Sequence, residues 1–199
     1  MAWVNYVSDP EEWCVLLKTV DFWRVLIPTP IEDQGDRFLT DKYIEDRLQR
    51  LVPSPKPYDI VHRTLYRVHQ RVAETYRIRE DVLIAGDAAH INNPLGGMGM
   101  NGGIHDAINL SEKLVAIINE GADKDELLDL YDRQRRGICL EFIQKHTMKN
   151  KALMEATDKE IRVKRQARFM KACSDPQLER AFLKETSMIN ALQQSYAIR

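Results

Sequence analysis

Two stretches near the N-terminus carry the apolar, β-branched and aromatic residues that are typical of β-strands. They are residues 13–17 and 22–27, and the residues 18–21 between them predict a turn. Pro28 ends the second stretch, because proline cannot donate a hydrogen bond to a β-ladder. Residues 9–12 also have the composition of a turn, so the first part of the chain is predicted to be β structure.

In the next part of the chain, the spacing of the apolar residues changes from that of a helix to the alternation of a strand. Thr40 is predicted to cap a helix over residues 41–51, whose apolar residues fall on one stripe. Prolines within residues 53–57 then predict an extended linker. From 58 to 72 apolar and polar residues alternate, which predicts one or two strands, although His62 and Gln70 interrupt the alternation.

A short apolar run at residues 81–86 ends on a glycine. Its continuous apolar character predicts a strand that is buried on both faces, as in a parallel sheet. Apolar residues then recur at helical spacing, which predicts a helix that begins near 100–101 and ends at Asn119. Gly121 is the predicted glycine that follows the end of this helix.

The remainder of the chain, after Asp123, is predicted to be helical throughout. The sequence of residues 174–177 (Ser-Asp-Pro-Gln) has the form of a capping box with proline in the first turn, and it predicts the start of a further helix. The basic stretch 159–171 lacks interleaved aromatic residues. It is therefore predicted to be a solvated helical face rather than a nucleic-acid site.

The composition indicates an ordinary globular protein of one or two domains. The chain has 199 residues, of which 44% are hydrophobic and 30% charged. Because the 29 basic residues are balanced by 30 acidic ones, the chain has no broad positive field to bind nucleic acid or an anionic membrane. No apolar run approaches the roughly 18 residues that a membrane span needs, and no leader-like segment is evident, so a cytoplasmic protein is expected. Three scattered cysteines favour reduced thiols, with neither a disulfide nor a metal site.

The glycines are concentrated in one place, because 6 of the 9 lie between Gly86 and Gly103. Asp87, directly after the predicted strand, has two acceptor oxygens that suit the hydroxyls of a ribose or ribityl chain. The glycines allow the main chain to approach a flat ligand, and the helix that follows offers its N-terminus to an anion. A glycine-rich turn would explain each feature singly, but the order of strand, Gly-Asp, proline loop, glycine turn and helix is more specific.

These residues resemble the second flavin-binding motif of the FAD-dependent aromatic hydroxylases, single-component monooxygenases similar to 4-hydroxybenzoate and phenol hydroxylase. Weaker similarity covers about residues 11–136. The resemblance implies an α/β fold, α+β within this portion, with three parts: a partial substrate-domain sheet with a helix over 1–72, one strand and a helix of the FAD-binding domain over 73–122, and a helical tail over 123–199. The matching segments are Gly86–His90, Pro94, Gly96–Gly102 and Asp106–Leu110.

The resemblance also implies roles for individual residues. FAD would be the cofactor and NAD(P)H the co-substrate in the hydroxylation of a small aromatic substrate with O2. Asp87 would bind FAD hydroxyls, and the helix N-terminus would stabilise the negative charge of reduced flavin. Pro94 would lie between flavin and substrate and is the one residue assigned to the catalytic site. The implied cofactor-binding residues are Gly86, Asp87, Ala88, Pro94, Gly97, Gly99, Met100 and Asn101.

The chain departs from the family pattern in two respects. The family begins with a Gly-x-Gly-x-x-Gly unit and carries a central Asp-Gly motif, and neither occurs in this sequence. The chain is therefore expected to be the C-terminal half of a hydroxylase, which would need a partner half or act as a homo-oligomer. Two alternatives stay open: a truncated, catalytically inert chain, and a related flavin-dependent halogenase or reductase.

Several polar residues around the motif are assigned structural rather than chemical roles. A histidine that follows a glycine turn is more often hydrogen-bonded in the core than bound to a ligand. Acidic and amide side chains in the first turns of a helix serve its dipole and its packing. The residues treated in this way are His90, Asp106 and Asn109. Trp23 and Arg24 lie on the strand that resembles one of the substrate domain; core or surface packing is expected for them, with the alternative that one of the two lines the aromatic pocket. Arg133, Arg135 and Arg136 are expected on a solvated face or in salt bridges.

Overall fold

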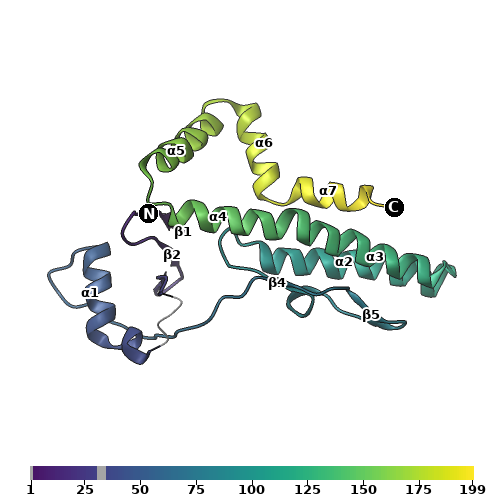
Figure 1. Ribbon diagram of the computed structural model, residues 1–199, viewed down its shortest axis with the longest axis horizontal. Helices are drawn as coiled ribbons and strands as arrows, with labels where there is room; N and C mark the ends of the chain where they lie inside the picture. Colours follow the sequence, from purple (N-terminus) through teal and green to yellow (C-terminus); the bar gives the residue numbers. More distant parts are fainter. Residues whose placement is uncertain (1, 31–34) are drawn as a thin grey trace. The chain divides into compact units, whose positions relative to one another are not determined.

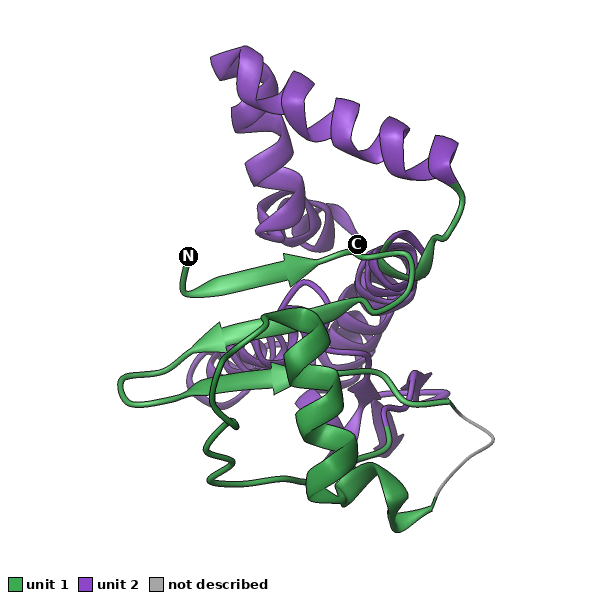
Figure 2. Ribbon diagram, turned by 90° about the vertical axis from the view of Figure 1, so that its left-hand side faces the viewer, with its two compact units in different colours: residues 1–67, 154–158 green, residues 68–153, 159–199 purple. Residues whose placement is uncertain are grey.

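The computed structural model describes residues 2–30 and 35–199. Its internal contacts divide the chain into two compact units, which Figure 2 colours separately. The first unit contains the residues up to Arg67 together with Met154–Asp158, and the second contains Val68–Leu153 and Lys159–Arg199. Each unit is described by itself below.

The first unit contains a three-stranded antiparallel sheet in the order β1-β2-β3. Its strands are β1 (Val4–Val7), β2 (Cys14–Lys18) and β3 (Trp23–Leu26). The two predicted strands and the turn between them are confirmed. The alternating side chains of β1 are half exposed, so its pattern was too weak to predict a strand from the sequence.

Helix α1 (Asp41–Leu51) follows the short helical segment η1 (Asp36–Leu39), as predicted. The Thr40 side chain accepts a hydrogen bond from the N–H of Tyr43 and caps the helix. From the other end of the helix, Arg47 and Arg50 form ion pairs with Glu12, in the turn before β2. These ion pairs fix α1 beside the sheet within this unit.

The strands predicted over residues 58–72 are largely absent, and this prediction was wrong. Only β4 (Arg71–Val72) is a strand, and it belongs to the second unit. Within the described residues, positions 58–70 pair with no neighbouring strand, and Val61 and Tyr66 are 64% and 50% exposed. An alternating pattern forms a ladder only where a partner strand supplies the hydrogen bonds.

The parallel strand predicted at residues 81–86 is also wrong. Only β6 (Val82–Leu83) is a strand, and it pairs antiparallel with β5 (Arg77–Arg79) in a small hairpin. The other two-stranded ladder pairs β4 antiparallel with β7 (His90–Ile91). No parallel pair occurs among the described residues. The apolar run therefore lacks the neighbours that would bury both of its faces.

The rest of the second unit is helical, as predicted. Figure 1 shows the long helix α2 beside a continuous rod made of α3, the π-helical segment η3 and α4. Helix α2 begins two residues before the predicted start, and Gly121 follows its end in a left-handed conformation with φ 70°. The helices of this region are α2 (Met98–Glu120), α3 (Lys124–Ile138), η3 (Cys139–Gln144), α4 (Lys145–Glu155), α5 (Lys159–Ser174), α6 (Pro176–Thr186) and α7 (Ile189–Ala197).

The core of the second unit lies where α2, α3, η3 and α7 meet the segment before β5. Tyr76, Tyr131 and Ile143 are fully buried there, with Met98 and Ala191 beside them. Tyr131 donates a hydrogen bond to the carbonyl of Ile84, which ties α3 to the residues after β6. Within the part of the chain that the structure describes, no helix is long and apolar enough to cross a membrane.

Candidate cofactor site

The glycine-rich motif folds into a turn, a loop and a helix N-terminus, all within the second unit. The turn is the short helical segment η2 (Gly86–Ala88), which comes directly after the hairpin. The turn packs closely against α2. The two backbones approach so closely that a Cβ atom added at Gly103 would lie 3.1 Å from the Cα of Gly86. A side chain at position 103 would require the two segments to move apart by a few tenths of an ångström. The Gly-Asp turn and the first turns of α2, which the sequence predicted separately, are therefore neighbours.

Asp87 is exposed at the tip of this turn. Its carboxylate forms no hydrogen bond or ion pair with any residue in 2–30 or 35–199. A carboxylate without a protein partner retains all of its acceptor sites. Asp87 can therefore accept hydrogen bonds from the hydroxyls of a bound ligand.

The N-terminus of α2 is likewise open. Gly97 begins the helix in a left-handed conformation with φ 65°, and no side chain caps the first N–H groups. Met98 is buried, whereas Met100 and Asn101 are exposed, with the Asn101 amide donating to the Gly97 carbonyl at 2.8 Å. An uncapped helix N-terminus carries partial positive charge and suits the anionic edge of a ligand.

The loop around Pro94 is held by buried amide side chains. The Pro94 carbonyl accepts from the N–H of Gly97 at 3.0 Å and closes a tight turn. On the N-terminal side, Asn93 donates to the Oε1 atom of Gln70 at 2.9 Å. On the C-terminal side, Asn150 of α4 donates to the Leu95 carbonyl at 3.2 Å. Pro94 itself is exposed between these two anchors.

Gln70 also connects the Pro94 loop to the helical rod formed by α3, η3 and α4. Its Nε2 atom donates to Gln144 Oε1 at 2.6 Å and to Thr147 Oγ1 at 2.8 Å, while Gln144 in turn donates to the Ile91 carbonyl. Nothing in the sequence pattern assigned these amides to the site. The one available signal was that Gln70 interrupts an otherwise apolar alternation.

A buried ion pair lies directly behind the Gly-Asp turn. Oδ1 of Asp106 is 2.8 Å from Nε of Arg135, and Oδ2 is 2.8 Å from Nε2 of His90. Burial raises the pKa of Asp106, but the hydrogen bond from His90 and the charge of Arg135 outweigh it and hold that pKa below its ordinary value. The structural role expected for His90 and Asp106 fits this geometry. Arg135 forms a salt bridge, one of the two roles expected for it, but it is fully buried rather than on a solvated face.

A second polar cluster joins α2 to α3 and to the C-terminal residues. The ammonium of Lys113 lies 2.8 Å from both Asn109 Oδ1 and Gln134 Oε1. Gln134 donates onward to the Ile198 carbonyl at 2.8 Å, and Arg135 donates to Ser195 Oγ at 3.3 Å. Asn109, expected to serve packing near the helix start, is thus a buried contact between helices.

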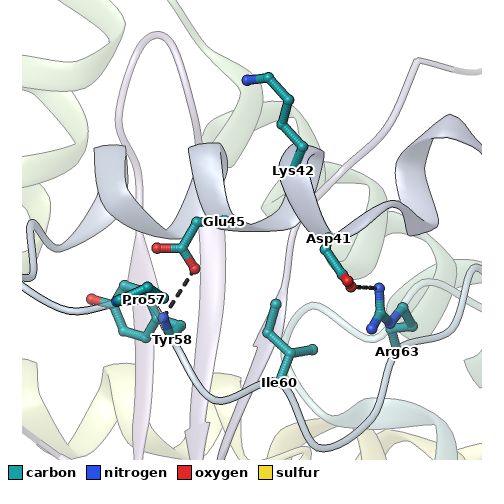
Figure 3. A pocket seen from close by; sticks show the side chains of 7 residues that line it. All are labelled: Asp41, Lys42, Glu45, Pro57, Tyr58, Ile60 and Arg63. Atoms are coloured by element: carbon teal, nitrogen blue, oxygen red, sulfur yellow. Dashed lines mark hydrogen bonds and ion pairs between the residues drawn. The ribbon is translucent and has the colours of Figure 1, made fainter.

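A separate hollow lies in the first unit. Figure 3 shows it between α1 and the segment 57–63, where Glu45 accepts from the N–H of Tyr58 and Asp41 pairs with Arg63. It is an open depression of about 430 Å³ that contains none of the predicted site residues. The motif residues are gathered around the turn and the α2 N-terminus instead.

The chemistry of the motif residues fits FAD. The free carboxylate suits sugar or ribityl hydroxyls, and the uncapped helix suits the negative charge of a reduced flavin. In the loop itself, the buried Oδ1 of Asn92 has no hydrogen-bond partner among the described residues, and a Cβ at Gly99 would be 3.4 Å from it. The glycine-rich main chain therefore lies beside an acceptor without a partner and beside the uncapped N-terminus of α2.

Comparisons with known proteins agree with this interpretation. A family model described as "FAD binding domain" matches residues 14–185, so the similarity continues beyond Arg136 into the predicted tail. Para-nitrophenol 4-monooxygenase of Pseudomonas sp. (strain WBC-3) is 37% identical over 195 residues, which are 94% of this chain and 46% of that protein. A 3-(3-hydroxy-phenyl)propionate/3-hydroxycinnamic acid hydroxylase of Mycobacterium avium (strain 104) is 40% identical over 117 residues, covering 58% of this chain and 20% of that protein.

The solved structure of p-nitrophenol 4-monooxygenase PnpA from Pseudomonas putida DLL-E4 superposes with a TM-score of 0.81 and 34% identity. The match covers 96% of this chain and 48% of that one. The chain thus spans less than half the length of these relatives.

Proposed function

Since the chain belongs to the FAD-binding domain family of the FAD-dependent aromatic hydroxylases, we propose that it forms the part of a monooxygenase that holds the flavin against its substrate. The observation that carries the proposal is the contact between the Gly86–Ala88 turn and the first turns of α2. It brings an unpartnered carboxylate and an uncapped helix end together.

Each part of the site has a proposed task. When bound, FAD supplies the redox chemistry with NAD(P)H and O2. Asp87 accepts hydrogen bonds from the ribose or ribityl hydroxyls, with the backbone of Gly86 and Ala88 beside it. The N–H groups at the start of α2 stabilise negative charge on the flavin. The main chain of Gly97, Gly99, Met100 and Asn101 lies along the ring.

Pro94 is the proposed boundary between flavin and substrate. Its loop is exposed, yet the amides of Asn93 and Asn150 fix it on both sides. A rigid, apolar ring at this position orients a flat substrate and excludes water from the reacting face. Its carbonyl accepts one hydrogen bond, from Gly97, and has a second lone pair available to a substrate hydroxyl.

The proposed substrate is a small phenol, and the most specific candidate is a para-substituted one such as 4-nitrophenol. The support comes from the relatives that match nearly the whole of this chain, which are named for p-nitrophenol. Residues 1–72 are the proposed portion of the substrate domain. Residues 73–122 are the proposed portion of the FAD-binding domain, and 123–199 are the helical region that supports it.

The proposal is tested by reconstitution. The 199-residue chain is purified alone and also together with a segment that carries a Gly-x-Gly-x-x-Gly unit. We expect the visible absorbance of bound flavin and NAD(P)H oxidation that depends on 4-nitrophenol and O2. The absence of both signals from both preparations would overturn the proposal. Asp87→Ala in the same preparation should weaken FAD binding and so assign the flavin to this site.

A second candidate is a chain that is inert by itself and acts only with a partner that supplies the rest of the fold. It is favoured by the apolar side chains that α2 leaves exposed, with Met100 at 74% and Ile118 at 76%. Between them, Ile104, Ile108 and Val115 are each about half exposed. A colourless, monomeric chain that gains flavin only on mixing with the second segment would support this candidate.

A further inference from the structure

The carboxylate of Asp106 is bonded to three groups from three different parts of the second unit. Besides Arg135 of α3 and His90 of β7, it accepts a hydrogen bond at 3.1 Å from the backbone N–H of Gly86, the first residue of the Gly-Asp turn. Asp106 is completely buried. One side chain therefore fixes the backbone that precedes Asp87.

The position of Asp106 along α2 gives this bond its significance. Asp106 lies about two turns after Met98, the first residue of the helix, on a rigid stretch of backbone. Whatever fixes Gly86 to Asp106 also fixes the turn relative to the helix N-terminus. Gly103 lies between the two and leaves just enough room for the contact.

The bonds to Arg135 and His90 determine where the carboxylate can lie. Both partners are buried, and hydrogen bonds to charged groups in a dry interior are strong and directional. A carboxylate held at both oxygens cannot follow small movements of the turn. The backbone of Gly86 must therefore lie where its N–H can reach the fixed carboxylate. The ion pair thus determines the position of the turn.

We propose that Asp106 is a positioning residue for the flavin, setting the separation between the Asp87 carboxylate and the N-terminus of α2. The inference rests on the proposed function, because it assumes that both features bind the same FAD. Asp106 itself touches neither cofactor nor substrate in this arrangement. It acts through the backbone of Gly86.

The test uses Asp106→Asn, a substitution of nearly the same shape. An amide has one acceptor oxygen and one donor group, so it cannot accept from Arg135 on one side and from Gly86 and His90 on the other. We expect the Gly86 amide to exchange with solvent about tenfold faster or more, measured by hydrogen–deuterium exchange on the FAD-free chain. We also expect weaker FAD binding and a more negative reduction potential of the bound flavin.

Asp132→Asn is the matched control. Asp132 of α3 also accepts a backbone N–H, that of Tyr76 at 2.6 Å, and an arginine, Arg136 at 3.4 Å. Its backbone partner lies outside the flavin motif. The control should speed the exchange of the Tyr76 amide but leave the FAD affinity and the flavin potential unchanged.

The outcomes separate this inference from the proposed function. If the unsubstituted protein binds no FAD, the proposed function fails, while the exchange of the Gly86 amide still decides whether Asp106 sets the turn. An unchanged Gly86 amide in Asp106→Asn overturns the inference, and so does an equal loss of FAD affinity in the two variants. If Asp106→Asn does not fold, a scalar coupling across the hydrogen bond from Gly86 N to the Asp106 carboxyl carbon decides the question in the unsubstituted chain.

Discussion

The Nε2 atom of His90 lies 2.8 Å from the Oδ2 atom of Asp106, and neither side chain is accessible to solvent. His90 follows the Gly-Asp turn in sequence, while Asp106 belongs to the helix whose N-terminus faces the proposed flavin. This hydrogen bond joins β7 to α2 across the core of the second unit. It also makes the stability of the unit depend on a group that titrates near neutral pH.

The first prediction concerns pH. Burial alone lowers the pKa of His90, but the hydrogen bonds and charges of Asp106 and Cys139 together outweigh burial, and the pKa rises from 6.5 to about 9. Cys139 and Tyr76 are the other titratable groups beside the ring, and Arg135 is the nearest fixed charge. A raised histidine pKa stabilises the folded chain fully below about 6.5, and this contribution is lost as the pH rises through about 9.

The free energy of unfolding should therefore fall between these two pH values, by at most about 3 kcal/mol. Urea unfolding at a series of pH values measures the fall, and His90→Gln should flatten it. Parallel pH profiles for the two proteins would contradict the prediction.

The second prediction concerns Asp87. Asp87→Ala should weaken FAD binding by about 10- to 100-fold, since hydrogen bonds to a charged group contribute about 1.5–3 kcal/mol. The free energy of unfolding should stay unchanged, because the carboxylate is exposed and has no partner among the described residues. Fluorescence titration with FAD measures the affinity. Glu120→Ala, at the far end of α2, is the control and should bind FAD like the unsubstituted protein.

The third prediction compares two glycines within helices. Gly103→Ala places a methyl group 3.1 Å from the Cα of Gly86, so the Gly-Asp turn must move, at a cost of about 1–3 kcal/mol and with weaker FAD binding. Gly137→Ala places one 3.7 Å from the side chain of Ile198, which is ordinary contact. It should stabilise α3 by about 0.5–1 kcal/mol. Urea unfolding of both variants measures the opposite signs, and equal shifts would refute the close contact.

The fourth prediction concerns the anchor of the Pro94 loop. Gln70→Ala removes one hydrogen-bond partner from each of Asn93, Gln144 and Thr147 in a largely buried cluster, and it should cost about 1–3 kcal/mol. Exchange of the Asn93 amide should become faster. Gln70→Glu keeps the acceptor and loses the donor, so the Asn93 amide should stay protected in that variant. If Gln70→Ala leaves the Asn93 amide protected, the loop is held by other contacts.

Short-range signals in the sequence predicted local structure well. Thr40 caps α1 as expected, and the end of α2 lies at Gly121. At α6 the capping pattern gave the correct start but the wrong residue, because Asp175 rather than Ser174 accepts from the N–H groups of Gln177 and Leu178. Each of these features depends on residues within one helical turn, so the sequence contains the whole signal.

Long-range partners could not be predicted in this way. The buried pair of Asp106 and Arg135 joins positions 29 residues apart, and Gln70 reaches Gln144 over 74 residues. A single sequence shows no link between them. The apolar pattern at 81–86 likewise indicates burial but not what covers it. The flavin motif was predictable because its residues are consecutive, whereas the residues that hold it in place are dispersed.

The π-helical segment Cys139–Gln144 connects α3 to α4 and determines how α4 is rotated about the helix axis relative to α3. Each residue turns an α-helix by about 100°, so deleting one residue within this segment would rotate α4 by more than a quarter turn against α3. Gln144, Thr147 and Asn150 would then leave the side facing Gln70 and Leu95. The alignment of the Pro94 loop therefore depends on the number of residues in the segment. Substitutions at its exposed positions, Leu140 and Glu141, should be tolerated where a single insertion or deletion is not.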